Sequence, residues 1–344
     1  MAEPPRPPEG SADGTRPASA AGSSSAGSSA DAGANRPDPA GPVAVSPTEL
    51  RNERTLDIDL LPTVALLERL NDEDATVAAA VRRALPELGR VVDAATRALR
   101  SGGRVHYFGS GTSGRLAVLD AAELGPTFSL PPGVVTAHLA GGEPALTRAA
   151  ESAEDDQASG AADAGLVTAV DVVIGLSASG TAAYVAGALS RSRQAGAVTA
   201  LITANRASPL TALADVVVCA DTGPEAITGS TRLKAGTAEK MLLNSFSTAL
   251  MVREGRTFSN LMVRLAPANA KLRTRQIRLL SQACGAAEAE CAEALAAAGG
   301  EVATALVMLL SGGEPPAARL ALASTAGVVR AAIDWVRNQG TATS

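Results

Sequence analysis

The sequence predicts an α/β protein in which a parallel sheet with flanking helices is followed by a small helical C-terminal domain. Short apolar runs rich in Val and Ile alternate with Ala-rich stretches long enough for helices, which is typical of a parallel sheet covered on both faces. Beyond Lys234 the alternation stops and only helical segments follow. With 344 residues, 46% of them hydrophobic, the chain can bury a large core and carry an appendage.

The first 45 residues differ in kind from the rest. Pro, Ser, Gly and Ala dominate them, so they bury too little surface to offset chain entropy, and residues 1–45 are expected to be a disordered leader. The stretch lacks the apolar core of a signal peptide, and no apolar run in the chain reaches the ~20 residues of a membrane span. We therefore expect a cytoplasmic protein without a membrane segment.

N-terminal helices are expected over 46–100. Apolar residues follow a helical period through 60–70, the acidic cluster 71–74 breaks it, and a second helix runs over 76–100. The α/β domain is expected over 101–280. Its strands are predicted at 104–109, 134–140, 171–177, 197–203 and 215–220.

Two long helices, over 234–253 and 267–280, are predicted to end the α/β domain. Residues 281–344 then contain short helical segments separated by Gly and Pro, which predicts a small helical C-terminal domain.

Charge and residue content exclude several function classes. A net charge of −5 without a concentrated basic patch argues against nucleic-acid binding. The three cysteines show no metal-ligand spacing, and only His106 and His138 are available as imidazoles. Both histidines lie in strand-like runs, so we expect structural roles for them and no metal site.

Three segments combine glycine with hydroxyl side chains ahead of a helix: GSGTSG at 109–114, GLSASGT at 175–181 and TGSTRLKAGTAEK at 228–240. Hydroxyls beside the N–H groups of a helix start form an anion cradle. Three such segments in one domain fit a sugar phosphate as the ligand. Tight strand-to-helix turns that cluster by chance are the alternative. The candidate ligands of phosphate and sugar hydroxyls are Ser110, Thr112, Ser113, Ser177, Ser179, Thr181, Ser230, Thr231 and Lys234.

Longer motifs carry a resemblance to a known family. They are YFGSGTSGRLAVLDAAELGPTF, AGGEPALTRAAESAEDD, GLSASGTAAYVAGAL and the stretch from GPEAITGSTRLKAGTAEK to LRTRQ. They closely resemble N-acetylmuramic acid 6-phosphate etherases. The resemblance implies a sugar isomerase (SIS) domain, a homodimer and no cofactor. It also implies conversion of N-acetylmuramate 6-phosphate and water to N-acetylglucosamine 6-phosphate and D-lactate.

Two carboxyl groups suffice for this chemistry. Direct hydrolysis of an alkyl ether is slow because the leaving alkoxide is very basic. In the open-chain sugar, the C1 aldehyde acidifies the C2 proton and the lactyl ether is β to the carbonyl, so lactate can be eliminated and water added at C3. One base at C2 and one acid at the C3 oxygen are needed, and they exchange roles when water adds.

The resemblance implies that Glu123 is the acid and Glu154 the base. Without it, Glu123 would be interpreted as a solvated helix-end carboxylate, and Glu154 as part of a charged face shared with Glu151. A straight helix over 113–123 would place Glu123 ~15 Å from the cradle. Either that helix ends early or the two groups come from different subunits. The segment TELRN, 48–52, is either an arm to a neighbour's site or an N-terminal cap.

The chain departs from the family pattern at two places. Leu124-Gly125 stands where Cys-Pro is common, and Thr181-Ala182-Ala183 stands where Arg-Thr-Pro is common, which removes a possible phosphate-binding cation. Two alternatives on the same domain stay open: a sugar-phosphate isomerase and a non-catalytic sugar-phosphate sensor. A dinucleotide enzyme is disfavoured because the glycine fingerprint is absent.

Overall fold

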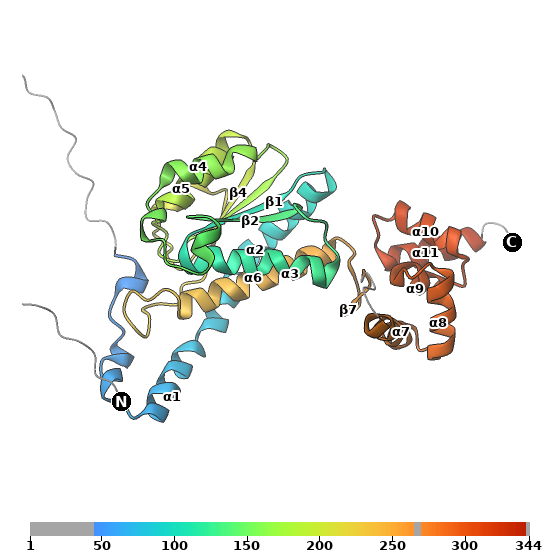
Figure 1. Ribbon diagram of the computed structural model, residues 1–344, viewed down its shortest axis with the longest axis horizontal. Coiled ribbons are helices and arrows are strands. Elements are labelled where there is room, and N and C mark those ends of the chain that lie inside the picture. Colours follow the sequence, from blue (N-terminus) through green and yellow to red (C-terminus); the bar gives the residue numbers. More distant parts are fainter. Residues whose placement is uncertain (1–44, 265–269, 342–344) are drawn as a thin grey trace, which may run out of the picture. The chain divides into compact units, whose positions relative to one another are not determined.

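The computed structural model describes residues 45–264 and 270–341, and Figure 1 shows its elements. The predicted leader lies outside the described residues, apart from Val45. The helices of the first part are α1 (Thr63–Asp74), α2 (Val77–Arg100), α3 (Gly111–Phe128), α4 (Gln157–Asp163), α5 (Ala183–Gln194) and α6 (Lys234–Arg253). The strands of the main sheet are β1 (Val105–Gly109), β2 (Val135–Leu139), β3 (Val172–Leu176), β4 (Val198–Thr203) and β5 (Val216–Cys219).

The five strands form one parallel sheet in the order β2-β1-β3-β4-β5. All five lie where the apolar runs predicted them, which confirms the α/β fold. The chain leaves β1 for β2 on one side and returns to β3 on the other. The carboxyl ends of β1 and β3 therefore flank the point where strand order reverses, which is where open α/β sheets bind ligands.

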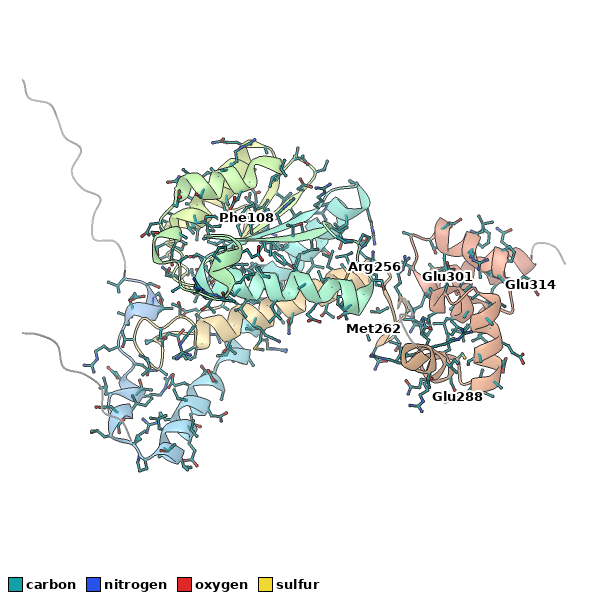
Figure 2. All side chains as sticks on the ribbon, viewed as in Figure 1. Phe108, Arg256, Met262, Glu288, Glu301 and Glu314 are labelled. Atoms are coloured by element: carbon teal, nitrogen blue, oxygen red, sulfur yellow. The ribbon has the colours of Figure 1, made fainter. Side chains whose placement is uncertain are left out.

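Alternate residues of each strand face different helical layers, as the period of two requires. Tyr107 and Ile174 belong to the core that α2, α3 and α6 form on one face. Phe108, Val173 and Leu201 belong to the core under α5 on the other face (Figures 1 and 2). Because strands buried on both faces must be apolar throughout, the runs of Val and Ile in the sequence are explained.

Helix α1 includes the acidic residues 71–74 that were expected to interrupt it. The reason is that Glu73 is buried and bonded to Arg54 and Lys234, so the last turn is held by ion pairs. The chain turns only at Ala75–Thr76. The apolar face of α2 packs against the sheet, because Val81, Leu88 and Val91 belong to the same hydrophobic cluster as the strand residues.

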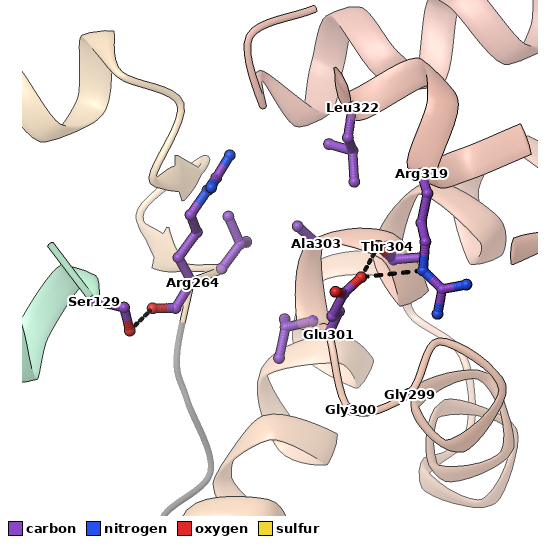
Figure 3. A pocket seen from close by; sticks show the side chains of 11 residues that line it. Ser129, Arg264, Gly299, Gly300, Glu301, Ala303, Thr304, Arg319 and Leu322 are labelled. Carbon is purple, nitrogen blue, oxygen red and sulfur yellow. Dashed lines mark hydrogen bonds and ion pairs between the residues drawn. The ribbon is translucent and has the colours of Figure 1, made fainter. Parts of the chain in front are cut away.

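The C-terminal region is helical, as predicted. It contains a short hairpin of β6 (Thr257–Phe258) and β7 (Leu261–Met262) and the helices α7 (Ala270–Cys284), α8 (Glu288–Ala297), α9 (Val302–Ser311), α10 (Pro315–Ser324) and α11 (Val329–Thr341). The helices share a core of their own, to which α7 contributes Leu280. At the start of α9, Glu301 accepts hydrogen bonds from Thr304 and Arg319 (Figure 3).

No single helix within 45–264 and 270–341 is long and apolar enough to cross a bilayer. Only α8 and α9 taken together reach the required length and apolarity, and they are bent at 117° to each other.

Candidate functional site

The three hydroxyl-rich segments meet at the carboxyl edge of the sheet. Ser113 of the first segment donates a hydrogen bond to Glu239 in the third. A Cβ at Gly236 would lie 3.5 Å from the methyl group of Thr112. Ala178 of the second segment packs with Ala235 of the third in a small buried cluster. The three segments therefore lie side by side although they are far apart in the chain.

The turn from β1 into α3 is tight and leaves the helix start uncapped. A Cβ at Gly114 would lie 2.5 Å from the carbonyl oxygen of Gly109, so glycine is required there. Ser110 is the N-cap residue with extended backbone, and its side chain makes no capping bond. The first N–H groups of a helix have no partner inside it, so this end is available to an anion.

A cavity of about 160 Å³ adjoins this helix start. It is lined by Ser110, Gly111, Arg115, Ala140, Ala145, Ala149, Ala150 and Glu154. The small volume is below the ~300 Å³ at which ligand pockets usually begin. The structure thus brings the predicted base, Glu154, to the same cavity as the first cradle.

Glu154 is positioned by its backbone as well as by its loop. It directly follows a 3₁₀ turn (Glu151–Ala153), and its carbonyl oxygen accepts a bond from the N–H of Tyr184 at the start of α5, at 2.9 Å. Partial burial of the carboxyl raises the pKa of Glu154, and the charge of Asp155 adds to this. A carboxyl group with a raised pKa is a better proton acceptor once it is ionised.

Arg115 also lines the cavity and anchors the loop after β2. Its guanidinium donates hydrogen bonds to the carbonyl oxygens of Ala145, Leu146 and Arg148. These bonds attach the loop after β2 to α3. They also leave a positive charge at the lining of the cavity.

The second segment is held by the end of β4 and by the loop that follows it. Thr203, Asn205 and Ser208 are buried, and they donate hydrogen bonds to the carbonyl oxygens of residues 178, 179 and 180, respectively. The Ser177 hydroxyl accepts from the N–H groups of Gly180 and Ala182, at 3.1 and 3.5 Å.

Ser179 and Thr181 stand at the outer side of this segment. Their hydroxyl oxygens lie 2.9 Å apart, and Thr181 is exposed. Thr181 stands where the resemblance leads us to expect Arg, and this pair offers hydroxyls without a cation.

The third segment is arranged differently, because its helix start is occupied by the chain itself. The buried carboxylate of Glu225 accepts bonds from the N–H groups of Lys234 and Ala235, both at 2.9 Å. Lys234 is 1% exposed, and its Nζ lies 2.7 Å from Glu73. Ser230 and Thr231 are partly exposed in the loop before this helix.

The N-terminal segment around 48–52 lies on its own chain. Thr48 accepts a backbone hydrogen bond from Gly229, Thr55 donates to the carbonyl oxygen of Ala226, and Asn52 donates to that of Pro224. It therefore supports the loop that carries Glu225.

Domain families and relatives match this region. The family of the glucokinase regulatory protein N-terminal SIS domain matches residues 87–193, and the SIS domain family matches residues 151–249. The N-acetylmuramic acid 6-phosphate etherase of Thermobifida fusca (strain YX) is 56% identical over 269 residues, which cover 78% of this chain and 88% of that protein. The chain belongs to the N-acetylmuramic acid 6-phosphate etherase family.

A second member of the family, from Enterobacter sp. (strain 638), is 47% identical over 289 residues, or 83% of this chain and 97% of that protein. Among solved structures, a phosphoheptose isomerase from Francisella tularensis aligns with a TM-score of 0.42 at 15% identity, over 54% of this chain and 98% of that one. The two etherase relatives confirm the resemblance found in the sequence. The match to the SIS domain family over residues 151–249 confirms the predicted SIS fold.

The second glutamate implied by the etherase resemblance, Glu123, lies elsewhere in the chain. Helix α3 is continuous from Gly111 to Phe128, and Glu123 is exposed on it. At ~1.5 Å per residue, Glu123 is ~18 Å along the axis from the first residue of α3. It does not line the cavity that contains Glu154.

The two histidines of the etherase chain form a stacked pair in the sheet. Nδ1 of His106 lies 3.2 Å from Nε2 of His138, whose ring stacks on Phe108 at 4.3 Å. Burial, together with the neighbouring His106, lowers the pKa of His138 to about 4. Within the described ranges there is no group of three or more His, Cys, Asp or Glu placed to hold a metal.

Sequence reasoning missed three contributors to this site. Arg115 stands directly in the GTSGR motif, but its carbonyl partners lie 30 to 33 residues further on. Glu225 and Glu239 belong to the GPEAITGSTRLKAGTAEK motif and were not singled out. A carboxylate shortly before a hydroxyl-rich helix start was the available signal for Glu225.

Proposed function

We propose that the chain is a carbon–oxygen lyase that cleaves the D-lactyl ether of N-acetylmuramic acid 6-phosphate by elimination and rehydration. The products are N-acetylglucosamine 6-phosphate and D-lactate. The observation that supports this most strongly is the shared cavity: the uncapped start of α3 and the carboxyl of Glu154 line the same space. Family membership supplies the substrate class.

In this proposal the phosphate lies at the start of α3. Its ligands are the N–H groups of that turn with Ser110 and Thr112, and the hydroxyls of Ser177, Ser179 and Thr181 from the second segment. Ser230 and Thr231 are left for sugar hydroxyls. Lys234 and Ser113 support the site from the core, because their polar atoms are already bonded to Glu73 and Glu239.

Glu154 removes the C2 proton of the open-chain sugar. Electrons from the C2–H bond form the C2–C3 double bond, and the C3–O bond to lactate breaks. Glu123 gives a proton to the departing lactate oxygen. Water then adds its oxygen to C3 as Glu123 takes its proton, and Glu154 returns a proton to C2, so the two carboxyl groups end as they began.

We propose further that Glu123 reaches this site from a second copy of the chain in a homodimer. The distance along α3 supports this, and so does the small volume of the cavity in one subunit. The N-terminal part also exposes large apolar side chains, between 48% and 79% each, as a surface for the second copy. They are Val45, Leu50, Leu56, Leu60, Val64 and Leu67. The location we propose is the cytoplasm.

The reaction is tested by incubating the protein with N-acetylmuramate 6-phosphate in deuterated water that contains heavy oxygen. We expect free D-lactate and a product with heavy oxygen on C3 and deuterium on C2. An isomerised sugar phosphate without lactate, or binding without turnover, would contradict the proposal.

The shared site is tested by mixing two inactive variants, Glu123→Ala and Glu154→Ala, under conditions that exchange subunits. With shared sites, half of the dimers are hybrids, and each hybrid has one intact site of two. Activity should therefore return to about a quarter of the wild-type value. Hybrids that stay inactive would place both carboxyl groups of a site in one subunit.

A further inference from the structure

Glu239 is a buried acid that the proposed reaction does not use. It lies in the second turn of α6, is 2% exposed, and faces the first turn of α3. The Ser113 hydroxyl lies 3.0 and 2.8 Å from its two oxygens. Among the described residues, Ser113 is the only hydrogen-bond partner of this carboxyl group.

The other titratable groups packed around α6 have partners of their own. Asp120 of α3 accepts bonds from Tyr107 and Ser247, and Glu73 of α1 is paired with Lys234. At the two ends of α6, Glu225 accepts from the first N–H groups and Arg100 of α2 pairs with Glu254.

Within the described part of the chain, the only side chain bonded to Glu239 is the neutral Ser113, and no ion pair with Lys or Arg is formed. Burial raises the pKa of Glu239 to about 8, against the smaller opposite effect of the bond from Ser113. With its pKa raised to about 8, the carboxyl group is expected to be mostly protonated at pH 7.

We infer that Glu239 is a positioning residue for the anion site: through Ser113 it ties the first turn of α3 to α6, so that the N–H groups of that turn keep their direction toward the cavity. This inference rests on the proposed ligand site at the start of α3. The packing of Thr112 against Gly236 shows how closely the two helices approach at this point. Ser113 is buried and bonded to Glu239, whereas Ser110 and Ser179 are partly exposed, which separates its role from theirs.

The neutral form of Glu239 matters for the ligand. A negative charge on Glu239 would be separated from the proposed phosphate at the start of α3 only by Ser113. Because Glu239 is buried, water would screen the repulsion poorly. Ionisation of Glu239 is therefore expected to weaken phosphate binding above about pH 8.

The test measures the affinity for inorganic phosphate by titration calorimetry, and KM and kcat for lactate release, between pH 6 and 9.5. Between pH 7 and pH 9.5 the affinity of wild type for phosphate should fall about tenfold more than the affinity of Glu239→Gln falls over the same range. Glu239→Gln should bind as wild type does at pH 7. Glu239→Ala should raise KM about tenfold and change kcat little.

Asp120→Asn is the matched control, because it removes another buried carboxyl between α3 and α6 that does not line the cavity. It should keep the alkaline weakening of phosphate binding. The inference is overturned if Glu239→Gln weakens at high pH as wild type does, or if a folded Glu239→Ala binds phosphate as tightly as wild type. Should Glu239→Ala fail to fold, the pH profile of Glu239→Gln decides alone. Because phosphate binding is measured without turnover, failure of the proposed reaction would be recognised separately.

Discussion

The helices α3 and α6 both start after segments rich in Gly, Ser and Thr, yet their N-termini have different partners. At α3 the N-cap side chain makes no bond, and the helix end adjoins a cavity with Glu154 in its wall. At α6 the N–H groups of Lys234 and Ala235 are already bound by the buried carboxylate of Glu225.

A helix start attracts negative charge, but the charge can come from the chain itself. At α6 it is supplied by Glu225, nine residues before Lys234, and the lysine turns into the core toward Glu73. At α3 no such carboxylate is present among the described contacts. The difference between the open start of α3 and the self-capped start of α6 is thus a single acidic side chain, and hydroxyl content does not distinguish the two.

The largest expected effect is at the α3 end. Glu154→Gln should lower kcat by about 10²- to 10⁴-fold, because a general base is lost from an otherwise intact cavity. Steady-state release of D-lactate measures this. Glu151→Gln, three residues earlier in the chain, is the control and should stay within about threefold of wild type. If the two variants lose activity equally, the cavity at α3 is not where the C2 proton is removed.

How far the sequence predicts this site depends on how local each interaction is. The five strands and the cradle at 109–114 were predictable, because strand period, glycine turns and helix starts are properties of neighbouring residues. The ion pair between Lys234 and Glu73 was not predictable, since the two residues are 161 positions apart in the sequence. The sequence offered a lysine beside hydroxyls, and only the fold shows that its amine is buried.

Other site features depended on the fold in the same way. Ser113 was expected among the outward ligands, yet the approach of α6 turns it toward Glu239. The separation of Glu123 from the cradle was foreseen from helical rise, and the unbroken α3 makes it definite. The proposed contribution of Glu123 from a second copy of the chain is a property of assembly, so neither local pattern nor a single chain determines it.

An intermediate effect is expected at the α6 end. Lys234→Met should lower the free energy of unfolding by ~3 kcal/mol, because it leaves Glu73 buried without one of its cations. Arg54 and Asn52 remain bonded to Glu73, which keeps the loss at the lower end of the usual range. Urea denaturation measures the stability, and KM is measured at a temperature where the variant is folded.

The same variant separates the two helix starts. If α6 is closed by its own chain, KM for the sugar phosphate should change less than about threefold in Lys234→Met. Glu225→Gln is the companion variant, which should also lose stability with little change in KM, since it weakens two buried hydrogen bonds. A tenfold rise in KM with unchanged stability would instead place the start of α6 in the ligand site.

The smallest effect concerns the acid limb of the pH profile. Burial and then the charge of Asp155 raise the pKa of Glu154, so Asp155→Asn should lower it. A base works in its ionised form, and a lower pKa keeps Glu154 ionised at more acidic pH. The acid limb of kcat/KM should therefore move to lower pH, with little change on the plateau. Glu225 is another buried carboxyl group with a raised pKa, but Asp155 is not among the charges that act on it. Asp155→Asn therefore separates an acid limb set by Glu154 from one set by Glu225. An acid limb that does not move in Asp155→Asn would mean that a carboxyl group other than Glu154 controls it. This outcome would contradict the proposal that Glu154, beside the start of α3, is the base.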